Sequence, residues 1–308
     1  MAGEADTNQI KALKWALFNI RVIGGYRQKN SILSYITITS LFLVISFMVA
    51  DLILNVNGIE SLRRVTFLPS LFVTSVKGFF MLINSKQLIK IVESLQQFWK
   101  PDIFDNETQE MIRKLLRKVT LLCASYSLSG LGVCILIATM PLLSIQERSL
   151  IYNDFTFCNL QSLFCWIPMY IWQFYALMLE MIPACLGFDC LFVSFIGYIM
   201  TACSLIKIAL QKLNTDNLKK RHYILKEIVK QHDFMMTFLN SVNDMFTIVM
   251  LLQFWGSLWS MILMLNMMVA NGLPPRAADV AYFGTLYAII FFQIFIYSTG
   301  GAIIEDRV

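Results

Sequence analysis

Apolar runs long enough to cross a lipid bilayer recur along this chain and limit its fold more than any other feature. A membrane-spanning helix needs about 20 consecutive apolar residues. Clear spans fall at residues 31–55, 65–84, 119–143, 245–270 and 280–304. Only 15% of the 308 residues are charged, whereas soluble domains are about 25% charged. The sequence therefore predicts an all-α integral membrane protein.

A sixth apolar run, residues 163–200, is too long for one ordinary span and has acidic residues inside it. It contains the stretch LEMIPACLGFDC, in which Glu180, Pro183 and Asp189 interrupt the apolar sequence. As one helix the run would be about 57 Å long. As two helices it would form a hairpin that turns near Glu180 and Pro183. The two alternatives place the rest of the chain on opposite sides of the membrane.

Basic residues decide between one crossing and two, because cytoplasmic connections of membrane proteins are enriched in Lys and Arg. Residues 1–30 contain five basic residues, residues 85–118 contain seven and residues 204–244 another seven. The remaining connections hold four in total. With one crossing, the three basic groups share the cytoplasmic side. We therefore expect the run to be one long helix that crosses once.

The expected architecture is a bundle of six transmembrane helices with long cytoplasmic helical extensions. The amino-terminal segment 1–30 and the connections 85–118 and 204–244 are assigned to the cytoplasm, and residues 305–308 form a short tail. Both connections carry apolar residues at helical spacing. No proline or glycine separates the second connection from the span 245–270. One helix is therefore predicted to run from the cytoplasm into the membrane.

Three charged residues fall inside the predicted spans: Lys77, Glu180 and Asp189. An acid at the centre of a membrane helix costs about 2.5–3.5 kcal/mol. Glu180 and Asp189 are nine residues apart, which places them on opposite sides of an ideal helix. Two roles stay open for each acid: hydrogen bonding to a neighbouring helix, or lining a polar cavity or ion path. Lys77 is a candidate partner for either acid, unless its ammonium extends to the membrane surface.

Aromatic and methionine side chains gather in the predicted outer halves of the spans. Such residues form interfacial belts and pack helices together. Collectively they also suit a pocket for a small apolar ligand, whose walls are mostly hydrophobic with few polar groups. Both interpretations stay open. The candidate ligand-binding neighbourhood consists of Phe72, Met140, Trp172, Tyr175, Met178, Trp259, Phe283 and Tyr287.

Catalytic and metal-binding motifs are not evident in the sequence. His222 and His232 are ten residues apart, which is not the spacing of a ligand pair. The common nucleotide-binding, hydrolase and metalloprotease patterns are absent. We therefore expect no enzyme activity, no metal and no cofactor. The seven cysteines favour buried free thiols, with one external disulfide between Cys158 and Cys165 as the alternative.

Two segments resemble the insect odorant receptor family. HDFMMTFLNSVNDMFTIVMLLQFWGSLWSMILM is similar to the fifth span of that family with its cytoplasmic lead-in, and GFDCLFVSFIGYIMTACSLIKIALQKL is similar to the fourth span. The matching residues are His232, Leu239, Asn243, Phe246, Leu252, Gln253, Phe254 and Ser257 in the first segment, and Asp189, Leu191 and Phe192 in the second.

The resemblance implies a subunit of an odorant-gated cation channel that binds small volatile apolar molecules in the outer half of its bundle. It also implies a hetero-tetramer with a co-receptor subunit, in the plasma membrane of olfactory neuron dendrites, with the amino terminus in the cytoplasm. The final segment IFIYSTGGAIIEDRV resembles the end of the family's sixth span. Because the pore-lining seventh span does not follow it, we do not expect this chain to conduct ions by itself.

Three other classes of membrane protein share some of these features. A gustatory receptor of the same superfamily stays an alternative, because its diagnostic signature lies in the seventh span. A secondary transporter would use the buried charges for ion coupling, but it predicts inverted repeats that the sequence does not show. A G-protein-coupled receptor needs the opposite orientation and is excluded by the basic residues. The expected partners are a small ligand, a co-receptor and the lipid bilayer, and no nucleic acid.

Overall fold

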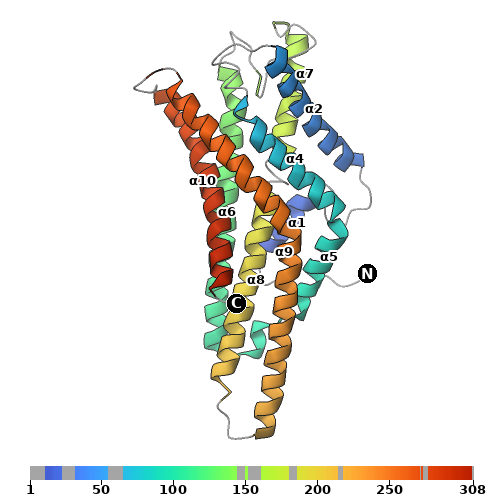
Figure 1. The fold of residues 1–308 in the computed structure, drawn as a ribbon, viewed down its shortest axis with the longest axis vertical. Coiled ribbons are helices and arrows are strands. Elements are labelled where there is room, and N and C mark those ends of the chain that lie inside the picture. Colours follow the sequence, from blue (N-terminus) through green and yellow to red (C-terminus); the bar gives the residue numbers. More distant parts are fainter. Residues whose placement is uncertain are drawn as a thin grey trace.

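The computed structural model describes residues 11–22, 32–54, 65–143, 150–151, 161–179, 186–213, 218–270, 272 and 277–306. Within these residues the regular structure is helical, so the predicted all-α class is confirmed. The α-helices pack into an elongated bundle (Figure 1). Their bounds are α1 Lys11–Val22, α2 Ile32–Leu54, α4 Leu68–Ile83, α5 Ser85–Ser94, α6 Asn106–Leu143, α7 Leu163–Leu179, α8 Phe188–Gln211, α9 Leu218–Val269 and α10 Ala277–Glu305. Short 3-10 helices follow α5 at Leu95–Gln97 and Pro101–Ile103.

Helix α9 is continuous over 52 residues, which confirms the predicted uninterrupted helix. At about 1.5 Å per residue it is about 78 Å long, whereas the hydrocarbon core of a bilayer is about 30 Å thick. Part of α9 therefore lies outside the membrane. There Ile228 and Met235 are buried in one cluster with Ala202, Ile206 and Ala209 of α8. The apolar stripe of the predicted connection thus finds its partner within the same chain.

The long apolar run contributes two described helices to the bundle, and the predicted continuity between them stays a prediction because residues 180–185 lie outside the described residues. Helix α7 ends at Leu179 and α8 begins at Phe188. In Figure 1, α7 occupies the upper part of the bundle and α8 continues below it. The two helices follow one another along the bundle axis, as expected for a single crossing.

Helix α1 belongs to the core, which was not foreseen from the basic amino-terminal sequence. One of its faces is buried against α6 and α8, while Trp15 and Phe18 on the other face are exposed. A Cβ atom added at Gly187, just before α8, would lie 3.0 Å from Ile20 Cγ1. The small residue therefore lets α1 approach the start of α8. The buried face consists of Ala12, Leu13, Ala16, Leu17 and Ile20.

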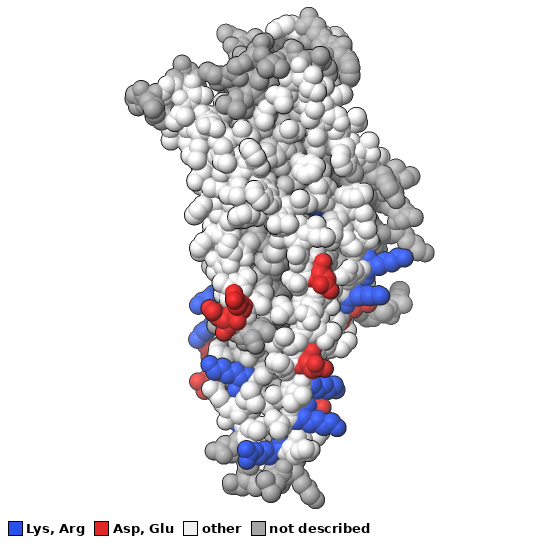
Figure 2. Space-filling model, in the orientation of Figure 1, with Lys and Arg blue, Asp and Glu red and all other residues white. Residues whose placement is uncertain are grey.

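Charged side chains are separated from the apolar surface along the bundle. On the face shown in Figure 2 they gather over the lower part, around the lower ends of the long helices. By length and hydropathy, several described helical segments can cross a bilayer, as a multi-pass membrane protein requires. These segments are Asn106–Thr139, Phe188–Gln211, Arg221–Val269, Val280–Glu305 and the pair Leu68–Ile83 with Ser85–Ile103, which is bent by 72°. The total of six spans stays a prediction.

An exposed ion pair at the charged end joins the start of α6 to the end of α8. Lys212 Nζ lies 2.7 Å from Asp105 Oδ1, and Thr108 Oγ1 donates to the same carboxylate. The hydrogen bond from Lys212 is the main cause that lowers the pKa of Asp105. A lowered pKa in the folded state means that the pair stabilises the fold above the ordinary pKa of Asp, and that this contribution is lost as pH falls through the lowered value.

We expect Asp105→Asn to lower the Tm of the purified protein slightly near neutral pH, because both partners are about half exposed. The difference in Tm between the two proteins should vanish in acid, where wild-type Asp105 is protonated. Thermal unfolding over a pH series measures it. A difference that grows as the pH falls would contradict the assigned sign.

Candidate functional site

A buried ion pair joins α4 to α8 in the middle of the bundle. Lys77 Nζ lies 2.8 Å from Asp189 Oδ1, and the two side chains are 0% and 3% exposed. Taking two charges out of water costs more than their attraction returns unless further hydrogen bonds surround them. The ammonium also lies 5.4 Å from the centre of the Phe188 ring, a distance at which the ring face attracts a cation.

Three neutral donors complete the surroundings of the Asp189 carboxylate. Tyr126 of α6 donates its hydroxyl to Oδ2 at 2.6 Å, and Gln293 of α10 donates Nε2–H to Oδ2 at 2.5 Å. The hydroxyl of Tyr297, one turn further along α10, donates to Oδ1. We call Lys77, Tyr126, Asp189, Gln293 and Tyr297 the Asp189 cluster. It holds four helices together around one negative charge.

A chain of amides extends the Asp189 cluster to α9. Gln293 Oε1 accepts a hydrogen bond from Gln253 Nε2 at 3.0 Å, and Gln253 Nε2 also donates to Ser257 Oγ at 2.7 Å. An ionised carboxylate can only accept hydrogen bonds, so Gln293 must present its amide N–H groups to Asp189 and its oxygen to Gln253. The charge at Asp189 thereby fixes the direction of every hydrogen bond as far as Ser257.

A cavity lies directly beside this chain of hydrogen bonds. Tyr126, Gln253 and Gln293 belong both to the hydrogen-bond network and to the cavity wall. The empty volume is about 850 Å³, including the space at its mouth. The other lining residues come from α4, α6, α7, α9 and α10 and from positions just before α4 and α8: Phe67, Ser70, Val73, Thr74, Gly130, Val133, Ile137, Leu177, Leu186, Gly256, Ser257, Ser260, Met264, Leu286, Ile289 and Ile290.

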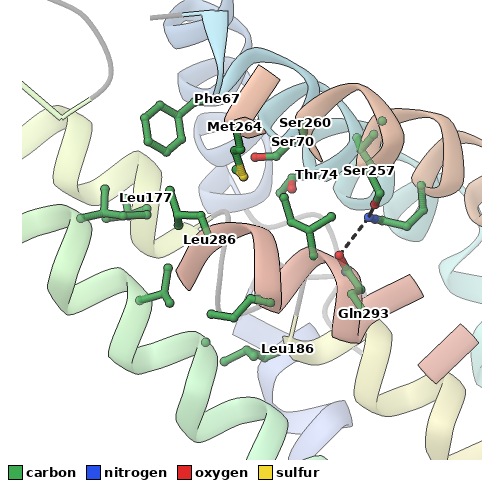
Figure 3. Close-up of a pocket in the computed structure, with 18 of the residues that line it drawn as sticks. Phe67, Ser70, Thr74, Leu177, Leu186, Ser257, Ser260, Met264, Leu286 and Gln293 are labelled. Atoms are coloured by element: carbon green, nitrogen blue, oxygen red, sulfur yellow. Dashed lines mark hydrogen bonds between the residues drawn. The ribbon is translucent and has the colours of Figure 1, made fainter. Parts of the chain in front are cut away.

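The cavity has a polar side and an apolar side. In Figure 3, Ser70, Thr74, Ser257 and Ser260 lie together toward α4 and α9, whereas the opposite side is formed by aliphatic side chains such as Leu177. The lining residues that the structure describes are all uncharged. Apolar walls with a few grouped polar atoms are typical of sites for small, mostly apolar ligands.

Close packing of α4 against α9 forms the polar side. A Cβ atom added at Gly256 would lie 2.3 Å from Val73 Cγ2 and 3.5 Å from the carbonyl oxygen of Pro69. Small residues let membrane helices approach closely in this way. Gly256 and Ser260 are four residues apart and therefore share one face of α9. Glycine at 256 thus brings the hydroxyl groups of both helices to the same cavity.

Several predicted ligand-binding residues lie away from the cavity. Phe72 and Trp259 are about half exposed, and Tyr175 is also exposed. Trp172 donates its indole N–H to Ser40 Oγ at 3.0 Å and thereby ties α7 to α2. Large aromatic side chains can face lipid at little cost. An aromatic residue in a predicted span is therefore weak evidence that the residue lines the cavity.

The other predicted residues lie either nearer to the cavity or outside the described part of the chain. Met178, Phe283 and Tyr287 pack in the apolar cluster that adjoins the cavity, and they do not line it. The side chain of Met140 and all of Glu180 lie outside the described residues. Ligand contact by the eight predicted residues stays a prediction.

Sequence reasoning found part of the site and missed the rest. Lys77 and Asp189 were predicted as buried charges, and the structure brings them together. The hydroxyl residues Ser70, Thr74 and Ser260 were missed, because isolated serines and threonines are common in membrane helices. The available signal was the small-residue spacing on α9 beside Gln253 and Ser257, both of which carry the family resemblance.

The described cysteines differ in whether they form a disulfide. Cys123, Cys134, Cys190 and Cys203 are reduced thiols outside any disulfide, as the favoured interpretation predicted. Cys165, near the start of α7, is disulfide-bonded, and its partner lies outside the described residues. At this position the expectation of a free thiol is wrong. Pairing with Cys158 stays a prediction.

The geometry defines a multi-pass membrane protein with an uncharged cavity beside a buried ion pair. A sequence model of the family described as 7tm Odorant receptor matches residues 57–308. Because the match covers most of the sequence, the chain belongs to the 7tm odorant receptor family. A comparison with curated proteins found no match. The proteins of this family are receptors, in agreement with the expectation that the chain is not an enzyme.

Solved structures show the same fold. The insect olfactory receptor OR5 from Machilis hrabei superposes with a TM-score of 0.77 at 16% sequence identity, over 94% of this chain and 78% of that chain. The same receptor in complex with eugenol gives a TM-score of 0.74 at 16% identity, over 92% of this chain and 77% of that chain. At this level of identity the likeness is one of fold.

Proposed function

We propose that this chain is the ligand-binding subunit of an odorant-gated cation channel and that the cavity beside the Asp189 cluster is the odorant site. The observation that carries the proposal is the cavity itself, whose walls are apolar and uncharged with polar groups on one side. Such a site suits a small volatile molecule. The related Machilis hrabei receptor, solved in complex with eugenol, supports a small organic ligand.

The proposed orientation places the charged end of the bundle and the amino terminus in the cytoplasm. Basic residues concentrate in residues 1–30, 85–118 and 204–244, as expected for cytoplasmic segments. The disulfide at Cys165 supports the opposite side for the start of α7, because disulfides persist in oxidising compartments. The proposed location is the plasma membrane of olfactory neuron dendrites, in a hetero-tetramer with a co-receptor subunit.

The Asp189 cluster is proposed to carry the ligand signal from the cavity to the lower bundle. A ligand shifts a conformational equilibrium only if it contacts the two states differently. Gln253 and Gln293 line the cavity and also hold the cluster. A ligand that presses on these amides alters the hydrogen bonds to Asp189, and with them the packing of α8 and α10.

The geometry around Asp189 favours a receptor over the alternative classes of membrane protein. Ion coupling in a transporter needs a carboxylate that exchanges its partners with a travelling ion. Asp189 already accepts hydrogen bonds from Lys77, Tyr126, Gln293 and Tyr297. The match to the odorant receptor family also favours that family over the gustatory receptors.

Filling the cavity tests the proposed site. Val133 of α6 is buried and lines the cavity, so Val133→Phe should occupy ligand space and reduce odorant responses at least tenfold. Ile135 on the same helix is 62% exposed, and Ile135→Phe is the matched control. The measurement is the odorant-evoked current in cells that express each variant with a co-receptor subunit, at equal surface expression. Unchanged responses in Val133→Phe, or equal losses in both variants, would contradict the proposed site.

A further inference from the structure

The cavity contains a polar atom that has no partner in the described part of the chain. Ser260 on α9 is 0% exposed, and its Oγ makes no hydrogen bond to any described residue. The side chain lines the cavity, and Figure 3 shows it on the polar side near Ser70. A buried hydroxyl without a partner is costly, so this atom indicates a group that the protein itself does not supply.

Three other buried serine and threonine hydroxyl groups in the bundle are satisfied by their own helix. Each bonds to the carbonyl oxygen four residues earlier, a common arrangement for serine and threonine in helices. Ser260 does not follow this pattern, and its hydroxyl stays directed to the cavity. The buried examples are Ser75 at 2.8 Å, Ser194 at 2.7 Å and Thr201 at 2.8 Å.

The charge at Asp189 also determines what Ser257 offers the cavity. Gln253 donates its Nε2–H to Ser257 Oγ, so the serine oxygen acts as the acceptor in that bond. A hydroxyl has one proton to donate in addition to its lone pairs. The proton of Ser257 and the hydroxyl of Ser260 therefore lie on the same side of the cavity as available donors. This side suits a ligand atom that accepts hydrogen bonds.

The cavity does not offer a counter-charge to an ionised ligand. Its described lining residues are uncharged, and the neighbouring carboxylate of Asp189 is matched by Lys77 at 2.8 Å. An ion would lose its hydration without gaining a partner. The cavity therefore suits a neutral ligand.

We infer that the cavity takes a neutral, mostly apolar molecule with one hydrogen-bond-accepting oxygen, such as a ketone, aldehyde, ester or alcohol. The Ser260 hydroxyl donates to that oxygen and makes the receptor prefer such a molecule over a hydrocarbon of the same shape. A site that provides a hydrogen bond discriminates against the analogue that cannot form it. This inference rests on the proposed function, since it names the ligand class of the same cavity.

The experiment measures binding to the purified chain with probe pairs that differ in the oxygen. The pairs are acetophenone with α-methylstyrene, and benzyl alcohol with ethylbenzene. The rise in Tm with ligand concentration gives the Kd of each probe. We expect the oxygenated member of a pair to bind about three- to tenfold more tightly, which corresponds to one net neutral hydrogen bond. Val133→Phe should weaken the binding of all probes, which locates them in the cavity.

Three serine variants identify the donor. Ser260→Ala should abolish the preference for the oxygenated probe while hydrocarbon binding is kept. Ser260→Cys keeps a side chain of similar length but donates weakly, so it should lose the preference too and separate the lost hydrogen bond from the added space. Ser75→Ala is the matched control, because Ser75 is buried, bonds to its own helix and does not line the cavity.

The outcomes separate the inference from the proposed function. Equal affinity for both members of each pair, or a preference that survives in Ser260→Ala, would overturn the inference and leave the odorant site in place. Failure of the folded wild-type protein to bind any probe, or binding that Val133→Phe does not weaken, would overturn both.

Discussion

Asp189→Asn is expected to destabilise the folded receptor by about 3–5 kcal/mol, because it leaves Lys77 buried without a counter-charge. The Lys77 side chain is 0% exposed, and among the described residues its ammonium would then face an amide oxygen and two aromatic rings. Two tyrosines and Gln293 lose a charged acceptor at the same time. Since proteins are stable by about 5–15 kcal/mol, surface expression and the Tm of the purified protein should fall sharply.

The double variant Lys77→Met/Asp189→Asn tests whether the unmatched charge causes the loss. Removing both charges leaves an acceptor for the surrounding donors and no buried ion, so stability should recover in part relative to Asp189→Asn. The exposed pair Lys212–Asp105 provides a control, because its disruption should change the Tm little. A double variant that is less stable than either single variant would contradict the account of the cluster.

Gly256→Ala is expected to separate α4 from α9 and to weaken ligand responses. The added Cβ would lie 2.3 Å from Val73 Cγ2, so one helix must move, at a cost of about 1–3 kcal/mol for overpacking. The displaced helices carry Ser70, Thr74 and Ser260, so the polar side of the cavity changes shape with them. Thermal unfolding and the half-maximal odorant concentration measure the two effects.

A second substitution distinguishes this steric effect from a general effect of replacing glycine. Val73→Ala removes the clashing methyl group, so Gly256→Ala/Val73→Ala should recover part of the Tm and of the response. Gly132 on α6 has open space where a Cβ would lie, and Gly132→Ala should be neutral or stabilising, since alanine favours a helix. An equal loss in Gly132→Ala would show that the close packing at Gly256 is not the cause.

Much of the fold could be predicted from the sequence, because long apolar runs have few alternatives to membrane helices. The continuous helix α9 followed from an unbroken apolar pattern. The basic residues predicted one crossing for the run that contains α7 and α8, because they determine the side of each connection, and they carry no information about helix continuity. The burial of α1 also depends on tertiary contacts, in which Ile20 meets Gly187.

The candidate site was less predictable, because its residues come together only in three dimensions. Lys77 and Asp189 are 112 residues apart, so the sequence made Lys77 a candidate partner for either acid and did not choose between Glu180 and Asp189. The predicted pocket relied on aromatic residues, and Phe72 and Trp259 face outward instead. The observed cavity wall consists mostly of aliphatic and hydroxyl side chains. The same residue types occur in ordinary helix-packing surfaces, so they do not mark a cavity in the sequence.

The most direct measurement is an experimental structure of the receptor with its co-receptor subunit and a bound odorant. Our account predicts ligand density in the cavity between α4, α6, α9 and α10, in contact with Gln253 and Gln293, with Lys77 and Asp189 paired beside it. Ligand density on the outer surface near Trp259, with the cavity filled by protein side chains, would contradict it.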